Sequence, residues 1–135
     1  MSAFAVRGIE PEDLDQYFDV RAQAFGLPAG DRARWRDFMS GAPETAGFGA
    51  FDGRRLLGAL RVIPGGQFVQ GRSVPMGGIA GVVVRPEARG AGVARTLLAE
   101  AVAWMRANGI AVSSLHPAST RAYRSAGWEL AGRAD

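Results

Sequence analysis

Residues 82–94, Val-Val-Val-Arg-Pro-Glu-Ala-Arg-Gly-Ala-Gly-Val-Ala, constrain the fold of this chain more than any other segment. They predict an apolar strand, a proline turn, and then a helix that begins at Val93. Gly90 and Gly92 allow a positive φ in the turn, and no Cβ keeps a ligand away from the backbone. The free N–H groups and the positive dipole of a helix N-terminus attract anions. The segment therefore predicts a pyrophosphate site, with the Arg89 side chain reaching a phosphate oxygen.

Two familiar nucleotide-binding patterns do not fit this segment. A phosphate-binding P-loop requires a Gly-Lys-Ser/Thr sequence, and the chain contains no lysine. The dinucleotide fingerprint requires a third glycine, where Arg95 stands instead, and an acidic residue about 20 positions later. The next predicted strand, residues 110–114, ends without an acid.

Composition excludes several classes of site and of protein. The chain has 135 residues, enough for one domain with a core, and we expect a single domain over 1–135. It has no cysteine and a single histidine, His116, which argues against a metal centre and a cysteine nucleophile. No apolar run approaches a membrane span, and the N-terminus does not resemble a signal peptide. We therefore expect a cytoplasmic protein with no metal and no membrane partner.

The positive net charge does not predict a nucleic-acid partner. The net charge is +3, and all basic residues apart from His116 are arginines, which are scattered along the chain. Arg32, Arg34 and Arg36 come closest to a basic cluster, but Asp31 and Asp37 flank them. Without a basic patch and interleaved aromatic residues, we interpret this segment as a solvated helix face.

Hydrophobic periodicity and turn residues predict an alternation of strands and helices. Pro11 begins a helix that Gly26 ends, and Asp52-Gly53 joins two strands in a hairpin. Helix 93–105 is amphipathic, with Leu97, Leu98, Ala101, Val102 and Met105 on its inner face. The expected strands cover residues 4–8, 46–51, 56–63, 77–84, 110–115 and 128–130, with a short hairpin over 68–74; the expected helices cover 11–25, a segment after residue 31, 93–105 and 117–127.

The pattern Arg89-x-x-Gly92-x-Ala94, which directly follows Val82-x-Val84-x-Pro86, resembles motif A of the GNAT (Gcn5-related) acyl-coenzyme A transferases. The resemblance implies an α/β (α+β) fold, in which helices flank a mixed, mostly antiparallel sheet in the order β-α-α-β-β-β-α-β-α-β. It also implies acetyl-coenzyme A as acyl donor and an amine as acceptor. The implied coenzyme contacts are Val82, Val83, Val84, Arg89, Gly90, Ala91, Gly92, Val93, Ala94, Arg95, Ala118 and Ser119.

Residues 119–129 resemble motif B of the same family, with Tyr123, Gly127 and Trp128 at the matching positions. The resemblance implies that Tyr123 lies beside the sulfur and acts as general acid, protonating the departing thiolate. The alternative is a half-buried tyrosine whose hydroxyl bonds a backbone carbonyl. We expect Trp128 to pack into the core.

Within the superfamily, residues 78–86 and 115–119 are similar to the enhanced intracellular survival (Eis) acetyltransferases, which acetylate amines of aminoglycosides. Members of that family have two further domains and use their terminal carboxylate as base. This chain stops at Asp135, so we expect either the N-terminal part of a longer protein or a shortened relative. His116 is the candidate base; the alternative is a histidine hydrogen-bonded at a strand end and stacked on Pro117.

The resemblance leaves the activity open. The chain is either an N-acetyltransferase, a catalytically silent domain that binds coenzyme A, or a module that needs missing partner domains. An open strand edge near Leu130 predicts self-association into a homo-oligomer.

Overall fold

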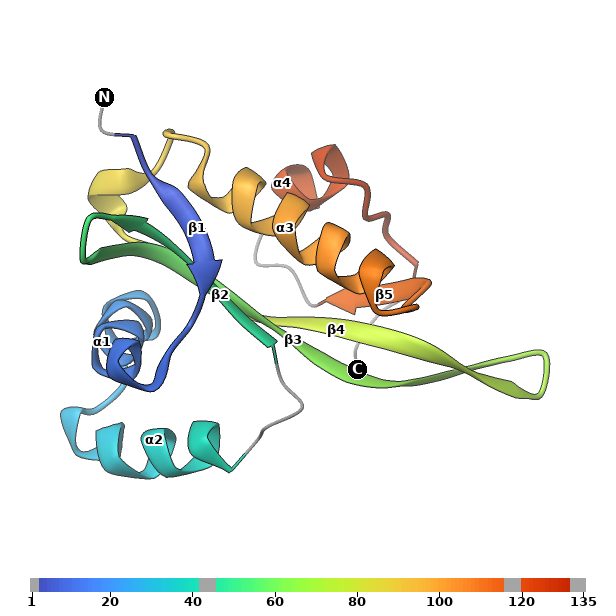
Figure 1. The fold of residues 1–135 in the computed structure, drawn as a ribbon, viewed down its shortest axis with the longest axis horizontal. Helices are drawn as coiled ribbons and strands as arrows, with labels where there is room; N and C mark the ends of the chain where they lie inside the picture. Colours follow the sequence, from blue (N-terminus) through green and yellow to red (C-terminus); the bar gives the residue numbers. More distant parts are fainter. Residues whose placement is uncertain (1–2, 42–45, 116–119, 132–135) are drawn as a thin grey trace.

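A computed structural model describes residues 3–41, 46–115 and 120–131 of the chain (Figure 1). A five-stranded sheet has the order β1-β2-β3-β4-β5, and all neighbouring strands are antiparallel except the parallel pair β4 and β5. The strands are β1 (Ala5–Gly8), β2 (Ala46–Asp52), β3 (Arg55–Val69), β4 (Arg72–Val84) and β5 (Val112–Leu115). The helices are α1 (Leu14–Phe25), α2 (Arg32–Ser40), α3 (Val93–Ala107) and α4 (Thr120–Ser125), with 3-10 turns η1 (Pro11–Asp13), η2 (Ala29–Asp31) and η3 (Pro86–Ala88).

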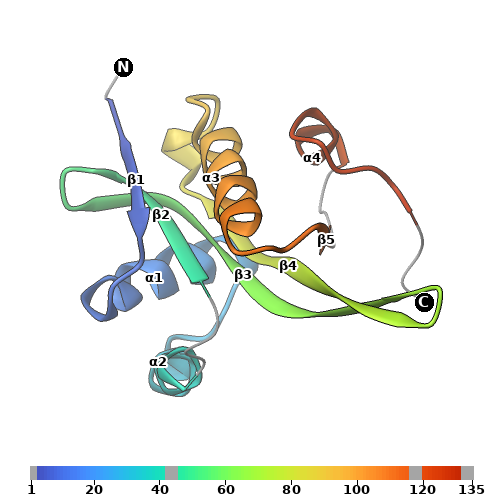
Figure 2. The ribbon, with the colours of Figure 1, turned by 45° about the vertical axis from the view of Figure 1, so that its right-hand side comes forward.

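Helices cover both faces of the sheet. Figures 1 and 2 show α1 and α2 on one face, and α3 with α4 on the other. Strand β3 supplies both cores: Leu60 and Val62 pack in the cluster that includes α3, whereas Leu56 and Ala59 pack in the cluster that includes α1. Ala59 follows from the alternation of side chains, and Leu56 reaches the α1 side because the β2–β3 register shifts between Gly58 and Leu56. Burial of both faces explains why the strand sequences are continuously apolar there.

The start of helix α3 and most of its inner face were predicted correctly. The helix begins at Val93, and Leu97, Leu98, Ala101 and Met105 are buried. Val102 is only partly buried. In α1, Leu14 and Phe18 are buried, whereas Phe25 is exposed.

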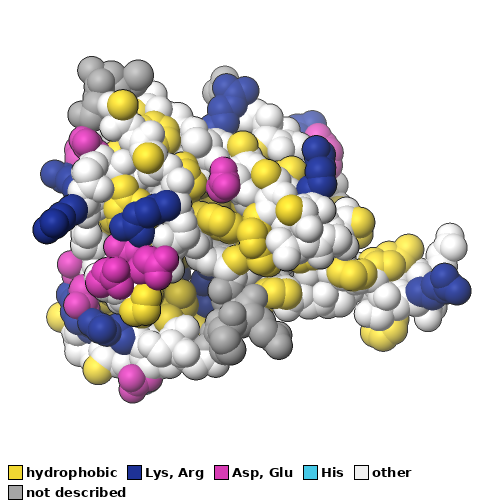
Figure 3. Space-filling model, in the orientation of Figure 1, with side chains coloured by type: hydrophobic (Ala, Val, Ile, Leu, Met, Phe, Trp, Pro, Cys, Tyr) yellow, Lys and Arg dark blue, Asp and Glu magenta, His cyan; other side chains and the backbone are white. Residues whose placement is uncertain are grey.

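The separate short hairpin predicted over residues 68–74 is part of a longer ribbon. Strands β3 and β4 stay paired from Gly58↔Val84 to Val69↔Arg72 and turn at Gln70 and Gly71, both with positive φ. Pro64 and Pro75 are compatible with this pairing, because a two-stranded ribbon has only edge positions, which tolerate a missing N–H. The ribbon projects from the body, and Figure 3 shows hydrophobic side chains along it; Phe68 near its tip is 77% exposed.

The predicted last strand, residues 128–130, is absent, and this segment has no regular secondary structure. The backbone N–H of Trp128 donates to the Tyr123 carbonyl, which ends α4, and Gly127 adopts φ +112°. The indole N–H of Trp128 donates to Ser113 Oγ at 3.2 Å, and the ring packs against the α3 core as expected. The helix cap and the indole contact thus attach the segment to α4 and to β5.

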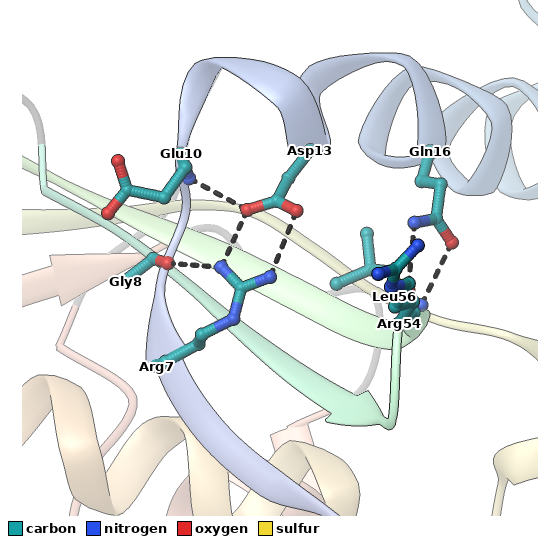
Figure 4. A network of polar contacts seen from close by, with 7 residues as sticks. All are labelled: Arg7, Gly8, Glu10, Asp13, Gln16, Arg54 and Leu56. Carbon is teal, nitrogen blue, oxygen red and sulfur yellow. Dashed lines mark hydrogen bonds and ion pairs between the residues drawn. The ribbon is translucent and has the colours of Figure 1, made fainter.

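Polar contacts attach α1 to the sheet (Figure 4). Arg7 on β1 forms two hydrogen bonds to the buried Asp13 carboxylate, of 2.7 and 3.0 Å. The same carboxylate accepts the backbone N–H of Glu10 at 2.8 Å. In the first turn of α1, the Gln16 side-chain oxygen accepts a 2.9 Å hydrogen bond from the backbone N–H of Leu56. These contacts fix the position of α1 over the sheet.

Candidate functional site

The N-terminus of α3 is an open backbone cradle. Gly90 and Gly92 adopt φ +84° and +82°, and Gly92 is the N-cap, without a side-chain cap. A Cβ built on either glycine would meet no atom within 4 Å, so the space in front of them is free. The first N–H groups of a helix have no acceptor within it, and the first turn of α3 contains no acidic side chain. This end can therefore receive an anion.

The arginines around this cradle divide into two groups. Arg89 and Arg95 are exposed, and neither forms an ion pair with any residue that the structure describes. By contrast, Arg85 donates to the Leu56 carbonyl, and Glu87 pairs with Arg55. Arg89 and Arg95 are therefore free to meet a ligand, whereas Arg85 fixes the turn to β3.

The two parallel strands part beside this cradle. The last paired residues are Ile79 and Leu115, after which β4 continues to Val84. On that side, residues 80–84 have no partner strand within the described parts of the chain. Val83 is buried and anchors the strand, while Val82 and Val84 pack partly against the α3 core. A free strand edge thus leads towards the α3 N-terminus.

A β-bulge interrupts β4 at the point where the strands part. Ala59 pairs with Val83 but Arg61 pairs with Ala80, so β4 carries one extra residue there. Gly81 in the bulge has φ +61°, and its carbonyl accepts a 3.0 Å hydrogen bond from the Tyr17 hydroxyl. Burial raises the pKa of Tyr17 to about 12, which keeps this donor protonated.

Tyr123 lies in α4 on the α3 face of the sheet. It is partly buried against the α3 core, and burial raises the pKa of its phenol. Its hydroxyl has no hydrogen-bond partner among the described residues, and its carbonyl caps the helix end. The hydroxyl therefore holds a proton at neutral pH and is not bonded to a described backbone carbonyl.

Three predicted site residues, His116, Ala118 and Ser119, lie outside the described residues. The predicted coenzyme contacts from Val82 to Arg95 follow one line, from the free edge of β4 through the turn to the start of α3, whereas Tyr123 lies separately on α4. A hollow of about 620 Å³ lies elsewhere, between the end of α3, β5 and residues 126–129, and includes none of the predicted site residues.

Sequence reasoning missed two arginines beside the bulge, Arg21 on α1 and Arg61 on β3. Each has a buried Nε–H without a hydrogen-bond partner in the part of the chain that the structure describes. A signal was present for Arg61, because it interrupts an otherwise apolar strand, residues 56–63. Arg21 sits on a mixed helix face and gave no comparable signal.

Among the described residues, no three His, Cys, Asp or Glu side chains lie close enough together to ligate a metal ion. Over the same residues, no helix is both long and apolar enough to cross a membrane.

Comparison with known proteins identifies relatives over nearly the whole chain. The family model described as acetyltransferase (GNAT) domain matches residues 5–131. No curated protein matches the sequence. The solved GCN5-related N-acetyltransferase from Kribbella flavida is 36% identical, with a TM-score of 0.83 over 91% of this chain and 32% of its own. The corresponding protein from Anabaena variabilis is 32% identical, with a TM-score of 0.86 over 96% of this chain and 33% of its own.

The chain thus spans about a third of the length of these two relatives. A further structure matches over its own full length. AAC(6')-Iy, solved with the bisubstrate analog CoA-S-monomethyl-acetylneamine, has a TM-score of 0.84 over 99% of this chain and 96% of its own. Its identity of 22% supports similarity of fold alone.

Proposed function

The chain belongs to the GNAT acetyltransferase domain family, and on this premise we propose that it transfers the acetyl group of acetyl-coenzyme A to a primary amine. One observation carries the proposal: β4 parts from β5 after Ile79, and its free edge leads to the uncapped N-terminus of α3. A pantetheine arm is an extended chain with amide groups, so it can pair with a free strand edge. A pyrophosphate suits a helix N-terminus.

In this proposal the backbone binds most of the donor. The N–H and C=O groups of Val82 and Val84 pair with the pantetheine, and Val83 anchors the strand from the opposite side. The pyrophosphate takes the N–H groups of residues 90–95, with Arg89 and Arg95 adding charge. Ala118 and Ser119 complete the proposed coenzyme contacts. The thioester then comes to the bulge, because the arm runs along β4 away from α3.

The proposed chemistry is direct acyl transfer. The amine nitrogen attacks the thioester carbonyl carbon, a C–N bond forms, and the C–S bond breaks with its electron pair remaining on sulfur. The Tyr123 hydroxyl donates its proton to that sulfur, and the proton lost by the amine passes to His116 or to water. Burial supports this role for Tyr123, since its raised pKa keeps the proton in place until the thiolate forms.

The finer assignment to Eis-like enzymes is also a proposal. It rests on the motif residues 78–86 and 115–119. If the chain is Eis-like, the acceptor is an amine of a small molecule or of a protein. The competing proposal is a domain that binds coenzyme A without turnover, or that requires partner domains.

Thiol release from acetyl-coenzyme A across a panel of primary amines tests the proposal. We expect amine-dependent release together with coenzyme binding in calorimetry. Binding without release for any amine would instead support the silent domain. Loss of both would contradict the placement of the donor itself.

We further propose that the protein self-associates through the outer edge of β5. No strand pairs with this edge within the described residues, and open edges pair readily with another chain. Light scattering at increasing protein concentration should show a dimer or larger species. A monomer at high concentration would refute self-association without affecting the proposed transfer.

A further inference from the structure

Two arginine side chains contact residues of α1 and α2. These two helices cover one face of the sheet (Figure 1). Arg21 comes from α1, and Arg61 comes from β3, opposite Ala80. A Cβ built on Gly81 would lie 2.7 Å from Arg21 Nη1 and 2.8 Å from the Tyr17 hydroxyl. The Arg21 guanidinium therefore borders the bulge, and Arg61 lies opposite Ala80 at its start, close enough for the charge of Arg21 to lower its pKa. Arg21 and Arg61 are called here the arginine pair.

The surroundings of the arginine pair are aromatic and apolar. The Arg21 guanidinium carbon lies 5.7 Å from the ring centroids of both Phe25 and Trp35. That of Arg61 lies 5.3 Å from the Phe38 ring, which is otherwise exposed. Ring faces attract cations but accept no hydrogen bond from Nε–H. Both Nε atoms are buried and have no hydrogen-bond partner among the described residues.

The arginine pair contrasts with the other arginines of the chain. Six arginines at the surface form ion pairs with carboxylates: Arg7, Arg32, Arg34, Arg36, Arg55 and Arg124. Arg21 and Arg61 have buried nitrogen atoms and no carboxylate partner among the described residues. Burial and the neighbouring positive charge of Arg21 both lower the pKa of Arg61. Two adjacent cations without an anion are costly to bury, so a bound anion would stabilise this arrangement.

The position of the arginine pair indicates which ligand supplies the anion. The phosphates of the proposed donor bind at the α3 N-terminus, which follows the Val84 end of β4. Arg21 of the pair instead borders Gly81, where the thioester is placed. An anion bound there belongs to the molecule that meets the thioester, which is the acceptor.

We propose that the acceptor amine carries an oxyanion, a carboxylate or a phosphate, which Arg21 and Arg61 bind while the amine faces the thioester. This inference rests on the proposed acetyl transfer. Planar guanidinium groups bind both oxyanions in a bidentate manner, so the chemistry is shared between the two. A polycationic amine such as an aminoglycoside is disfavoured at this site, because the pair would repel it.

Matched acceptors test the inference on the full chain. One pair is β-alanine and β-alaninamide, which differ in a carboxylate; the other is O-phosphoethanolamine and ethanolamine, which differ in a phosphate. Thiol release gives kcat/KM for each amine. We expect at least a tenfold preference for the anionic member of one pair, and the pair that shows it distinguishes carboxylate from phosphate. Equal rates, or a preference for the amines that lack the anionic group, would overturn the inference.

Variants test whether the arginine pair causes the preference for anionic acceptors. Arg21→Gln and Arg61→Gln should each reduce the preference at least tenfold through KM, with unchanged coenzyme affinity in calorimetry. Arg61→Lys keeps the charge and should restore part of it. Arg72→Gln, on the exposed ribbon, removes one charge at a distance and should behave as wild type. A preference that survives in both glutamine variants would contradict the assignment.

A direct binding measurement separates this inference from the proposed transfer. If no amine releases thiol, the transfer proposal is wrong, and the arginine pair is then tested by titrating O-phosphoethanolamine and β-alanine into protein loaded with coenzyme A. Binding that is lost in Arg21→Gln and Arg61→Gln would support the anion site. No binding of either probe to the wild type would overturn it.

Discussion

The Tyr17 hydroxyl donates a 3.0 Å hydrogen bond to the Gly81 carbonyl and so connects α1 to the bulge of β4. Gly81 has φ +61°, a conformation that glycine adopts readily because it has no Cβ. Tyr17 is fully buried, so this bond forms away from water. It fixes both the bulge and the helix that carries Arg21.

Tyr17→Phe removes this bond and should destabilise the protein at pH 7 by about 1 kcal/mol. The pH dependence is a sharper test. The pKa of Tyr17 is raised to about 12, so above pH 10 the unfolded chain loses the proton while the folded chain keeps it. Stability should therefore fall between pH 10 and 12, by roughly 2 to 3 kcal/mol from this group. Urea unfolding should show this loss in the wild type and not in Tyr17→Phe; parallel pH curves would contradict it.

Tyr123→Phe keeps the ring packing and removes the proposed proton donor. We expect kcat to fall by roughly 10² to 10⁴. Coenzyme affinity in calorimetry should change little, because the proposed donor contacts are mostly backbone. A near wild-type kcat in steady-state assays would mean that Tyr123 only packs and that water protonates the sulfur.

The Arg7–Asp13 pair should control stability in acid. Its hydrogen bond from Arg7 lowers the pKa of the Asp13 carboxyl, with a further contribution from the Glu10 N–H. This stabilisation is present above the unfolded-state pKa and disappears as the pH falls through the lower folded-state pKa. Asp13→Asn should unfold at lower urea at pH 7 and show a flatter pH dependence below pH 5. Asp52→Asn, at an exposed turn, is the control and should retain the wild-type slope.

Local signals predicted those parts of the fold that depend on neighbours in sequence. Gly92 and Val93 define the start of α3 because the turn and the apolar period both change there. The same local signals failed where contacts between residues distant in sequence determine the structure. Pro64 pairs opposite Gly77 within the ribbon, and Trp128 bonds Ser113 and the end of α4.

The candidate site divides in the same way. The turn before α3 is continuous in sequence, so its pattern predicted the glycine conformations and the helix start. That this turn binds the donor stays a prediction. The arginine pair is not continuous in sequence: Arg21 and Arg61 are 40 residues apart in number and meet only when α1 packs on β3. Their missing partners are visible only in three dimensions, because an unsatisfied Nε–H is a property of the packed structure.

Gly92→Asp tests the donor cradle directly. The substitution places a carboxylate at the proposed pyrophosphate site and a Cβ in the open space before the helix. Both effects oppose the binding of an anion, so coenzyme affinity in calorimetry should fall at least tenfold. Gly53→Asp is the matched control: it also has a positive φ and open surroundings, but lies at the β2–β3 turn. It should lose stability to a similar degree and keep its coenzyme affinity. Equal affinity in both variants would show that the pyrophosphate binds elsewhere.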